Sequence, residues 1–239
     1  YDTTWFGNHL QFHPDLTVLI GDVRNLENLS LIGFDTVIHL ASIANDPCGD
    51  LNPALTWEIS VLATQQLAEI AVSCGVKDFI YASSGSVYGL SHAENVTENE
   101  ILVPISTYNK TKMCAERVLL SYSEQINIKI IRPATVCGLS SRMRLDVAVN
   151  MLTIQALQNK EITVLGGEQI RPNIHIDDLA ALYAFFVNSD KKLNGIYNAG
   201  FENLKIIDIA KMIVSETEAQ IIIKKSNDPQ SYRLCSDKL

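Results

Sequence analysis

Residues 78–89 read Asp-Phe-Ile-Tyr-Ala-Ser-Ser-Gly-Ser-Val-Tyr-Gly, and this stretch decides the class of fold. After Asp78, the residues Phe79 to Ala82 form an apolar and aromatic run, which a Ser- and Gly-rich loop follows. A short run without polar alternation is typical of a strand that is buried on both faces in a parallel sheet. We therefore expect a strand over residues 78–82, with the polar residues after it at the edge of that sheet.

Similar strands and longer helical patterns alternate around this stretch. Further strands are predicted at residues 17–20, 35–40 and 128–132, helices at 53–74 and 107–125, and a polar loop at 83–106. This order favours an α/β fold of the Rossmann-like, doubly wound type, with a parallel sheet between two layers of helices. Ligands of such sheets bind beyond the carboxyl ends of the strands.

The character of the sequence changes after about residue 140. Helices are predicted at about residues 147–159, 177–188 and 206–216, separated by short strand-like pieces. This pattern indicates a smaller lobe formed mainly by residues 141–239, with some elements that return to the first domain at residues 1–140.

Composition limits the classes of partner and of site. The 239 residues are 47% hydrophobic and 19% charged, and the net charge of −8 makes nucleic acid a poor partner. No run of about 18 apolar residues predicts a membrane span. Five widely spaced cysteines indicate free thiols in a reducing compartment such as the cytoplasm. The histidines do not cluster at metal-ligand spacing, so no metal site is expected.

Tyr108 and Lys112 are the sharpest local feature. Their spacing of four residues places both side chains on one face of the predicted helix. An ammonium beside a phenol favours the phenolate, as a proton-abstracting base requires. The alternative is a chance pair, because neither residue type is rare in this chain.

Hydroxyl groups follow the strand at residues 78–82. Ser84 and Ser86 lie where a ligand would bind, and a serine there can donate a hydrogen bond to a substrate oxygen. The alternative is an ordinary Ser/Gly turn. Asp22 follows the predicted strand at residues 17–20 and can accept from an adenine amine, or it can serve as a turn or N-cap residue.

Several motifs occur in one order along nearly the whole chain: GDV (21–23), HLAS (39–42), ASSGSVYG (82–89), PISTYNKTK (104–112), IIRPATVCG (130–138) and RPNIHIDDLA (171–180). With this order the sequence resembles the extended short-chain dehydrogenase/reductase family, the group that contains NAD-dependent nucleotide-sugar epimerases and dehydratases. A Ser-Tyr-Arg stretch at residues 231–233 adds to the likeness.

The resemblance implies a role for each matching residue. It makes residues 1–140 a dinucleotide-binding domain and the smaller lobe a substrate-binding one. Ser84, Tyr108 and Lys112 would be catalytic. Contacts with NAD, rather than NADP, would come from Asp22, Val23, Leu40, Ala41, Ser42, Ala82, Ser83, Tyr108, Lys112 and Pro133. The nucleotide-diphosphate sugar would contact Ser84, Ser86, Thr135, Arg171 and Arg233, where the alternative for either arginine is a surface ion pair.

The sequence also departs from the family pattern. The first strand and its Gly-rich pyrophosphate turn are not in this sequence, and we expect them to precede residue 1. Gly85 and Ser86 stand where sugar 4,6-dehydratases carry an acidic pair, which disfavours dehydration. Ser60 and Thr135 each replace an asparagine that is usual in the family.

These observations favour an NAD-dependent epimerase that transiently oxidises a sugar hydroxyl. The same residues would serve an NAD(P)H-dependent reductase of a nucleotide-linked keto-sugar, and a non-catalytic dinucleotide-binding protein is the third possibility. The family likeness further implies a homodimer that pairs the helices at residues 53–74 and 107–125 of two copies.

Overall fold

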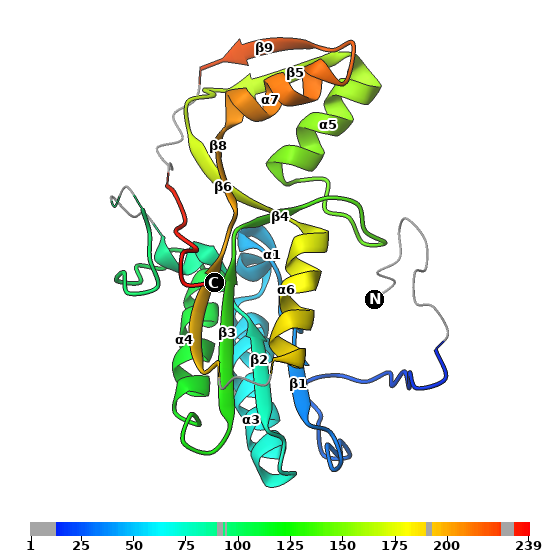
Figure 1. The fold of residues 1–239 in the computed structure, drawn as a ribbon, viewed down its shortest axis with the longest axis vertical. Coiled ribbons are helices and arrows are strands. Elements are labelled where there is room, and N and C mark those ends of the chain that lie inside the picture. The colour runs from blue at the N-terminus through cyan, green and yellow to red at the C-terminus, as the bar shows by residue number, and fades with distance from the viewer. Residues whose placement is uncertain (1–12, 90–92, 94, 190–192, 226–231) are drawn as a thin grey trace.

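A four-stranded parallel sheet forms the centre of the molecule in the computed structural model (Figure 1), which describes residues 13–89, 93, 95–189, 193–225 and 232–239. Its strands lie in the order β1 (Thr36–His39), β2 (Asp78–Ala82), β3 (Asn127–Pro133) and β7 (Gly195–Ala199). Three of the predicted strands and the parallel sheet are thus confirmed. β7 comes from the C-terminal part of the chain and pairs with β3, residue Lys129 opposite Gly195.

One face of this sheet is covered by a long helical segment and by a second helix. The segment consists of α2 (Pro53–Trp57), the π-helix η1 (Glu58–Leu62) and α3 (Ala63–Ser73), and the second helix is α4 (Thr107–Leu120). Phe79 and Ile128 pack there against Leu67 and Leu119, all four of them buried. The apolar stripes of the helices and one face of the sheet therefore form the first core.

The opposite face of the sheet is covered by α6 (Ile176–Asn188), as Figure 1 shows. Ile80 and Ile131 point to this side and pack with Leu179 and Phe186. Alternate residues of β2 and β3 thus enter two different cores, as the two-residue repeat of a strand requires. Helices on both faces confirm the doubly wound arrangement.

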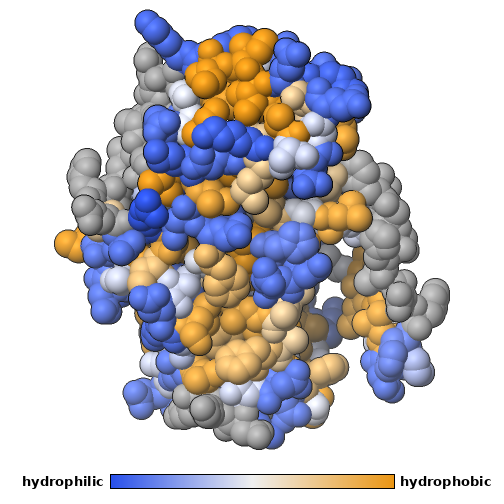
Figure 2. Space-filling model, turned by 45° about the horizontal axis from the view of Figure 1, so that its top comes forward, coloured by the Kyte–Doolittle hydropathy of each residue, from blue (hydrophilic) through white to orange (hydrophobic). Residues whose placement is uncertain are grey.

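A second group of elements lies beyond the carboxyl end of the sheet (Figure 1). It contains α5 (Ala148–Asn159), β5 (Glu161–Leu165), α7 (Ile206–Ser215) and β9 (Gln220–Lys224), with a core of its own. Figure 2 shows hydrophobic residues on the surface at this end, where Met212 and Ile223 are exposed. The sheet β4 (Thr135–Cys137), β6 (Ile170–His175) and β8 (Glu202–Lys205) connects this group to the main sheet.

Five local features differ from the predictions. Residues 17–20 form no strand, and Val18 and Leu19 are exposed, because no strand among the described residues lies beside them to pair with their backbone. A short helix, α1 (Asp46–Leu51), was not predicted, nor was the π-helical turn inside residues 53–74. The predicted helix at 107–125 ends at Leu120, and the predicted loop at 83–106 contains the 3₁₀ turn η2 (Gly85–Tyr88).

The last described segment crosses back to the main sheet. Leu234 is buried in the core below α6 and pairs with Val96 in an isolated parallel bridge. The amide of Val96 donates to the carbonyl of Arg233 at 2.8 Å, and the amide of Cys235 donates to the carbonyl of Val96 at 2.9 Å. These bonds anchor the long loop after β2. No helix in the described part of the chain has the length and apolar character needed to cross a membrane.

Candidate active site

The ends of β2 and β3 and the start of α4 surround a cavity of about 580 Å³. Ser83 and Ser84 follow β2, Pro133 ends β3, and Tyr108 lies in the first turn of α4. The helix begins there because the Ser106 side chain caps it, accepting from the Asn109 amide at 3.1 Å. Parallel strands and this cap thus bring residues from three parts of the sequence to one wall.

A chain of polar side chains runs along this wall. Tyr108 shares a hydrogen bond with Ser84, whose Oγ lies 2.7 Å from Ser86 Oγ. Ser86 Oγ in turn donates to Asn109 Oδ1 at 2.6 Å. Burial raises the pKa of Tyr108, and the Ser84 hydrogen bond opposes that rise. A phenolate at Tyr108 therefore needs a positive charge nearby.

Lys112 provides a positive charge one helical turn beyond Tyr108. Its side chain is buried, and its Nζ lies 5.9 Å from the centroid of the Tyr108 ring and donates to the Ala82 carbonyl at 2.6 Å. Burial lowers the pKa of Lys112 to about 8, while the carboxylate of Glu116 opposes that change. The structure thus brings the predicted residues Ser84, Tyr108 and Lys112 close together. The Lys112 ammonium is fixed beneath the cavity wall.

The far side of the cavity carries residues of the connecting sheet. Thr135, Arg171 and Asn173 line it, together with Tyr232. Oδ1 of Asn173 is buried without a hydrogen-bond partner among the described residues, which fits a wall that receives a polar ligand. Arg233 is exposed and does not line this cavity, and Ser231 lies outside the described residues.

A second cavity of about 1040 Å³ adjoins the first, and both are lined by Asn45, Arg144 and Asp146. Ser42 lines this second cavity, and its Oγ lies 3.1 Å from Ser60 Oγ of the π-helix. Ser60 is buried, and this hydrogen bond therefore fixes the loop after β1, to which Ser42 belongs. The two cavities form one hollow along the carboxyl ends of the strands, where doubly wound sheets bind their ligands.

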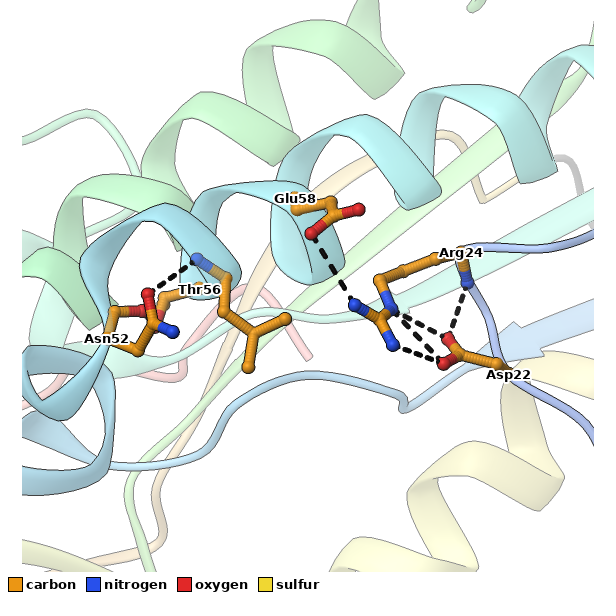
Figure 3. Close-up of polar contacts among 6 residues, drawn as sticks. Asp22, Arg24, Asn52, Thr56 and Glu58 are labelled. Carbon is orange, nitrogen blue, oxygen red and sulfur yellow. Dashed lines mark hydrogen bonds and ion pairs between the residues drawn. The ribbon is translucent and has the colours of Figure 1, made fainter.

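Asp22, Val23, Leu40 and Ala41 do not line either cavity. Asp22 lies in an exposed turn, where Arg24 forms hydrogen bonds with both of its carboxylate oxygens, the shortest at 2.6 Å (Figure 3). The guanidinium of Arg24 also forms an ion pair with Glu58 at 3.6 Å. The hydrogen bonds from Arg24 lower the pKa of Asp22 to about 2. Leu40 is exposed at the end of β1. Their predicted contacts with a cofactor stay predictions.

The sequence reasoning missed many of the residues that line the hollow, among them Asn45, Asp46, Arg144, Asp146 and Asn173. Asn173 had a signal, since it follows the Arg171-Pro172 pair of a quoted motif. Arg144 and Asp146 had none, because a loop arginine and a loop aspartate two residues apart are common on surfaces. Asn45 adopts a φ of 69° with a ψ of 160°, a backbone strain that no pattern in the sequence announces.

A hydroxyl and a phenol on one wall, with a buried ammonium behind them, can exchange a proton with a ligand oxygen. The residues present fit the nicotinamide end of a dinucleotide: a long hollow passes Ser42 and reaches Tyr108, with Lys112 buried behind it. The ring of Tyr81 lies beside that same ammonium, with its centroid 4.9 Å from Lys112 Nζ, and the Tyr81 hydroxyl is buried without a partner among the described residues. The Gly-rich pyrophosphate turn is not part of the sequence, so these residues fit only part of such a cofactor.

Comparison with known proteins identifies relatives of this chain. The chain is 29% identical over 217 residues to an N-acetyl-alpha-D-glucosaminyl-diphospho-ditrans,octacis-undecaprenol 4-epimerase of Escherichia coli O157:H7, covering 88% of this chain and 61% of the relative. It is 30% identical over 193 residues to a UDP-glucuronate 4-epimerase of Thermodesulfobacterium geofontis, covering 75% of this chain and 58% of the relative. The chain thus spans little more than half the length of these relatives.

A solved structure is also similar to this chain. The UDP-glucuronic acid 4-epimerase of Bacillus cereus, in complex with UDP-glucuronic acid and NAD, superposes with a TM-score of 0.73 and 30% identity, covering 85% of this chain and 67% of that one. Residues 6–200 match the family model of the NAD dependent epimerase/dehydratase family, which is most of the chain. The site, the fold and these matches agree, and the chain belongs to the NAD dependent epimerase/dehydratase family.

Proposed function

We propose that the protein is an NAD-dependent epimerase of a nucleotide-diphosphate sugar, acting by transient oxidation of a sugar hydroxyl. The observation that carries this proposal is the meeting of Ser84 and Tyr108 on one cavity wall, with the ammonium of the buried Lys112 behind it. Relatives that act as 4-epimerases, one of them on UDP-glucuronate, support the reaction class.

The same hollow suggests which residues would hold the cofactor. NAD, when bound, takes up a hydride from the sugar and later returns it. Ser42, which lines the second cavity, is proposed to contact the adenosine half of NAD, and Ser83 and Pro133, which line the first cavity, its nicotinamide half. Asp22, Val23, Leu40 and Ala41 are proposed to contact the adenosine, and Ala82, Tyr108 and Lys112 the nicotinamide and its ribose.

Proton transfer is assigned to this chain's own side chains. Tyr108 takes the proton of the reacting hydroxyl, Ser84 holds the same oxygen through a hydrogen bond, and the Lys112 charge stabilises the phenolate. When the keto group of the sugar is presented by its other face, Tyr108 returns the proton to the oxygen. No proton is consumed over the full cycle, so the residues end as they began.

The substrate is proposed to occupy the cavity between Ser84 and the connecting sheet. Arg171 can bind the diphosphate through its planar guanidinium, and Thr135 and Ser86 can contact the sugar hydroxyls. Asn173 adds a buried acceptor on the same wall. Arg233, exposed in this structure, is proposed as a second diphosphate contact.

Neutral residues near Ser84 favour epimerisation over dehydration. Gly85 and Ser86 occupy the positions at which an acid could take a carbon-bound proton, and Ser86 is engaged with Asn109. Five cysteines without disulfides are compatible with the proposed cytoplasmic location. A homodimer is part of the same proposal.

The test uses full-length protein. We expect near-stoichiometric NAD to be released on denaturation, and a panel of nucleotide sugars followed by NMR to show inversion at one carbon. Tyr108→Phe should lower kcat by about 10² to 10⁴-fold without loss of folding, because it removes the acid–base group. Tyr122→Phe, which removes a hydroxyl bonded to exposed Glu69, is the matched control and should keep full activity.

Other outcomes would contradict the proposal. An empty site that consumes NADPH with a keto-sugar would identify a reductase. Unchanged turnover in Tyr108→Phe, or no binding of either dinucleotide, would remove the enzymatic interpretation.

A further inference from the structure

A buried ion pair lies directly behind the proposed active site. Glu116 on α4 and Arg132 on β3 are each 1% exposed. Arg132 Nε donates to Glu116 Oε1 at 2.9 Å, and its Nη2 donates to Oε2 at 2.6 Å. Two charges taken out of water cost desolvation energy, which an apolar pair would avoid. Such a pair next to a catalytic wall therefore calls for a role beyond stability.

Glu116 contacts the segments that carry the site. Its Oε1 accepts a hydrogen bond from Ser83 Oγ, the residue before Ser84. Its partner Arg132 precedes Pro133, which lines the cavity. One helical turn before Glu116, Lys112 donates to the carbonyl of Ala82. A single carboxylate thus joins the ends of β2 and β3 to the face of α4 that carries Tyr108 and Lys112.

Arg132, the other member of the ion pair, is also held by a hydrogen bond. Arg132 Nη1 donates to the Tyr88 hydroxyl at 2.7 Å, and that hydroxyl donates to Asn198 Oδ1 at 2.6 Å. Asn198 is fully buried on β7 and also donates to the carbonyls of Val96 and Cys235. The carboxylate of Glu116 is therefore held in place by strands on both sides of β3.

We propose that Glu116 is a positioning residue for the proposed reaction: it fixes Ser83 at the end of β2, one helical turn from the Lys112 ammonium, so that Ser84 and Tyr108 meet the reacting oxygen. This inference rests on the proposed function. Its geometric basis is the set of hydrogen bonds that Glu116 accepts from Ser83 and Arg132, beside the bond from Lys112 to the Ala82 carbonyl. The charge of Glu116 also raises the pKa of Lys112 and so opposes the effect of burial.

The groups around Lys112 come from every element packed against it. Tyr108 and Glu116 lie on α4, Tyr81 on β2 and His39 on β1, and Arg132 on β3 is bonded to Glu116. Burial, assisted by the Lys112 charge, lowers the pKa of His39 to about 4, so His39 is neutral at pH 7. Burial raises the pKa of both tyrosines. Among these named groups Glu116 is the carboxylate, and it forms the ion pair with Arg132.

The experiment compares pH–rate profiles of full-length protein. Loss of the Lys112 charge at high pH should produce the alkaline limb, and Glu116→Gln should move that limb about one unit toward lower pH. We expect kcat to fall about tenfold or more with KM changed less than threefold, because positioning acts on the reacting atoms. Since Gln leaves Arg132 without its partner, the double variant Glu116→Gln/Arg132→Gln is measured beside it and should show the same shift.

The matched control is the ion pair Lys129–Asp78, whose atoms lie 2.8 Å apart at the other end of the same strands. Asp78→Asn should lower stability and leave the pH profile in place. Profiles of Glu116→Gln and of the double variant that overlay on wild type would overturn the proposal. A shift of equal size in Asp78→Asn would overturn it too.

A readout without catalysis separates this proposal from the proposed function. NMR titration of the Lys112 side chain gives its midpoint directly, and we expect Glu116→Gln to lower that midpoint. An inactive wild type with a lowered midpoint in the variant would reject the epimerase reaction and keep the electrostatic role of Glu116. An unchanged midpoint would reject that role even in an active enzyme.

Discussion

Gly49 on α1 is the residue against which Tyr108 packs. A Cβ at position 49 would lie 3.1 Å from Tyr108 Cβ and 3.2 Å from its backbone nitrogen. We expect Gly49→Ala to displace Tyr108 by a few tenths of an ångström and to lower kcat about tenfold, because small errors in a catalytic geometry are costly. Steady-state kinetics check this.

The control for that variant is Gly21→Ala, where a Cβ meets nothing within 4 Å. It should leave kcat unchanged. Equal activity of Gly49→Ala and Gly21→Ala would show that the contact with α1 does not position Tyr108. Thermal unfolding of both variants separates a local shift from a general loss of structure.

Among single residues of the candidate site, the sequence could predict those that have a recognisable place in a helix or at the end of a strand. Tyr108 and Lys112 follow from helical spacing, and Ser84 from the end of a strand. Glu116 has no such signal, because a polar residue inside a helix is usually exposed. Only the packing of β3 against α4 makes the Glu116 charge a buried one.

Gly89 decides the course of the loop after β2. Its φ is 64°, and a Cβ there would collide with the carbonyl of Val103. We expect Gly89→Ala to lower the free energy of unfolding by about 3 kcal/mol, since both backbone strain and a clash with backbone result. Gly75→Ala, with φ of 76° and open space, should cost only about 1 kcal/mol. Chemical denaturation measures both, and equal costs would contradict the clash.

The elements differ in how far sequence alone predicts them. β2 was predicted with its observed bounds, because a buried central strand is an uninterrupted apolar run. Residues 17–20 carry the same kind of run, yet they form no strand, because pairing depends on a neighbour and not on propensity. The π-helical turn at η1 leaves the apolar pattern of its helix intact, so periodicity does not reveal it.

At the scale of the whole molecule, the proposed homodimer predicts association through the helical layer of α2, η1, α3 and α4. Leu62 is 54% exposed on η1, where the partner copy would cover it. We expect sedimentation at micromolar concentration to show a dimer, and Leu62→Glu to weaken association at least about tenfold. Leu157→Glu, at a leucine 59% exposed on α5, should leave association unchanged. A monomeric wild type would contradict the homodimer.

The bridge between Val96 and Leu234 has a consequence for the order in which the molecule forms. During synthesis the ribosome releases β1, β2 and β3 long before residue 234, so those strands can pair while the loop after β2 still lacks its anchor. The wall of the candidate site includes that loop's first residues, and Tyr88 at its start is bonded to Asn198, which itself contacts Cys235. We therefore expect a nascent chain to form the sheet first, and to complete the candidate site only after Cys235 has left the ribosome.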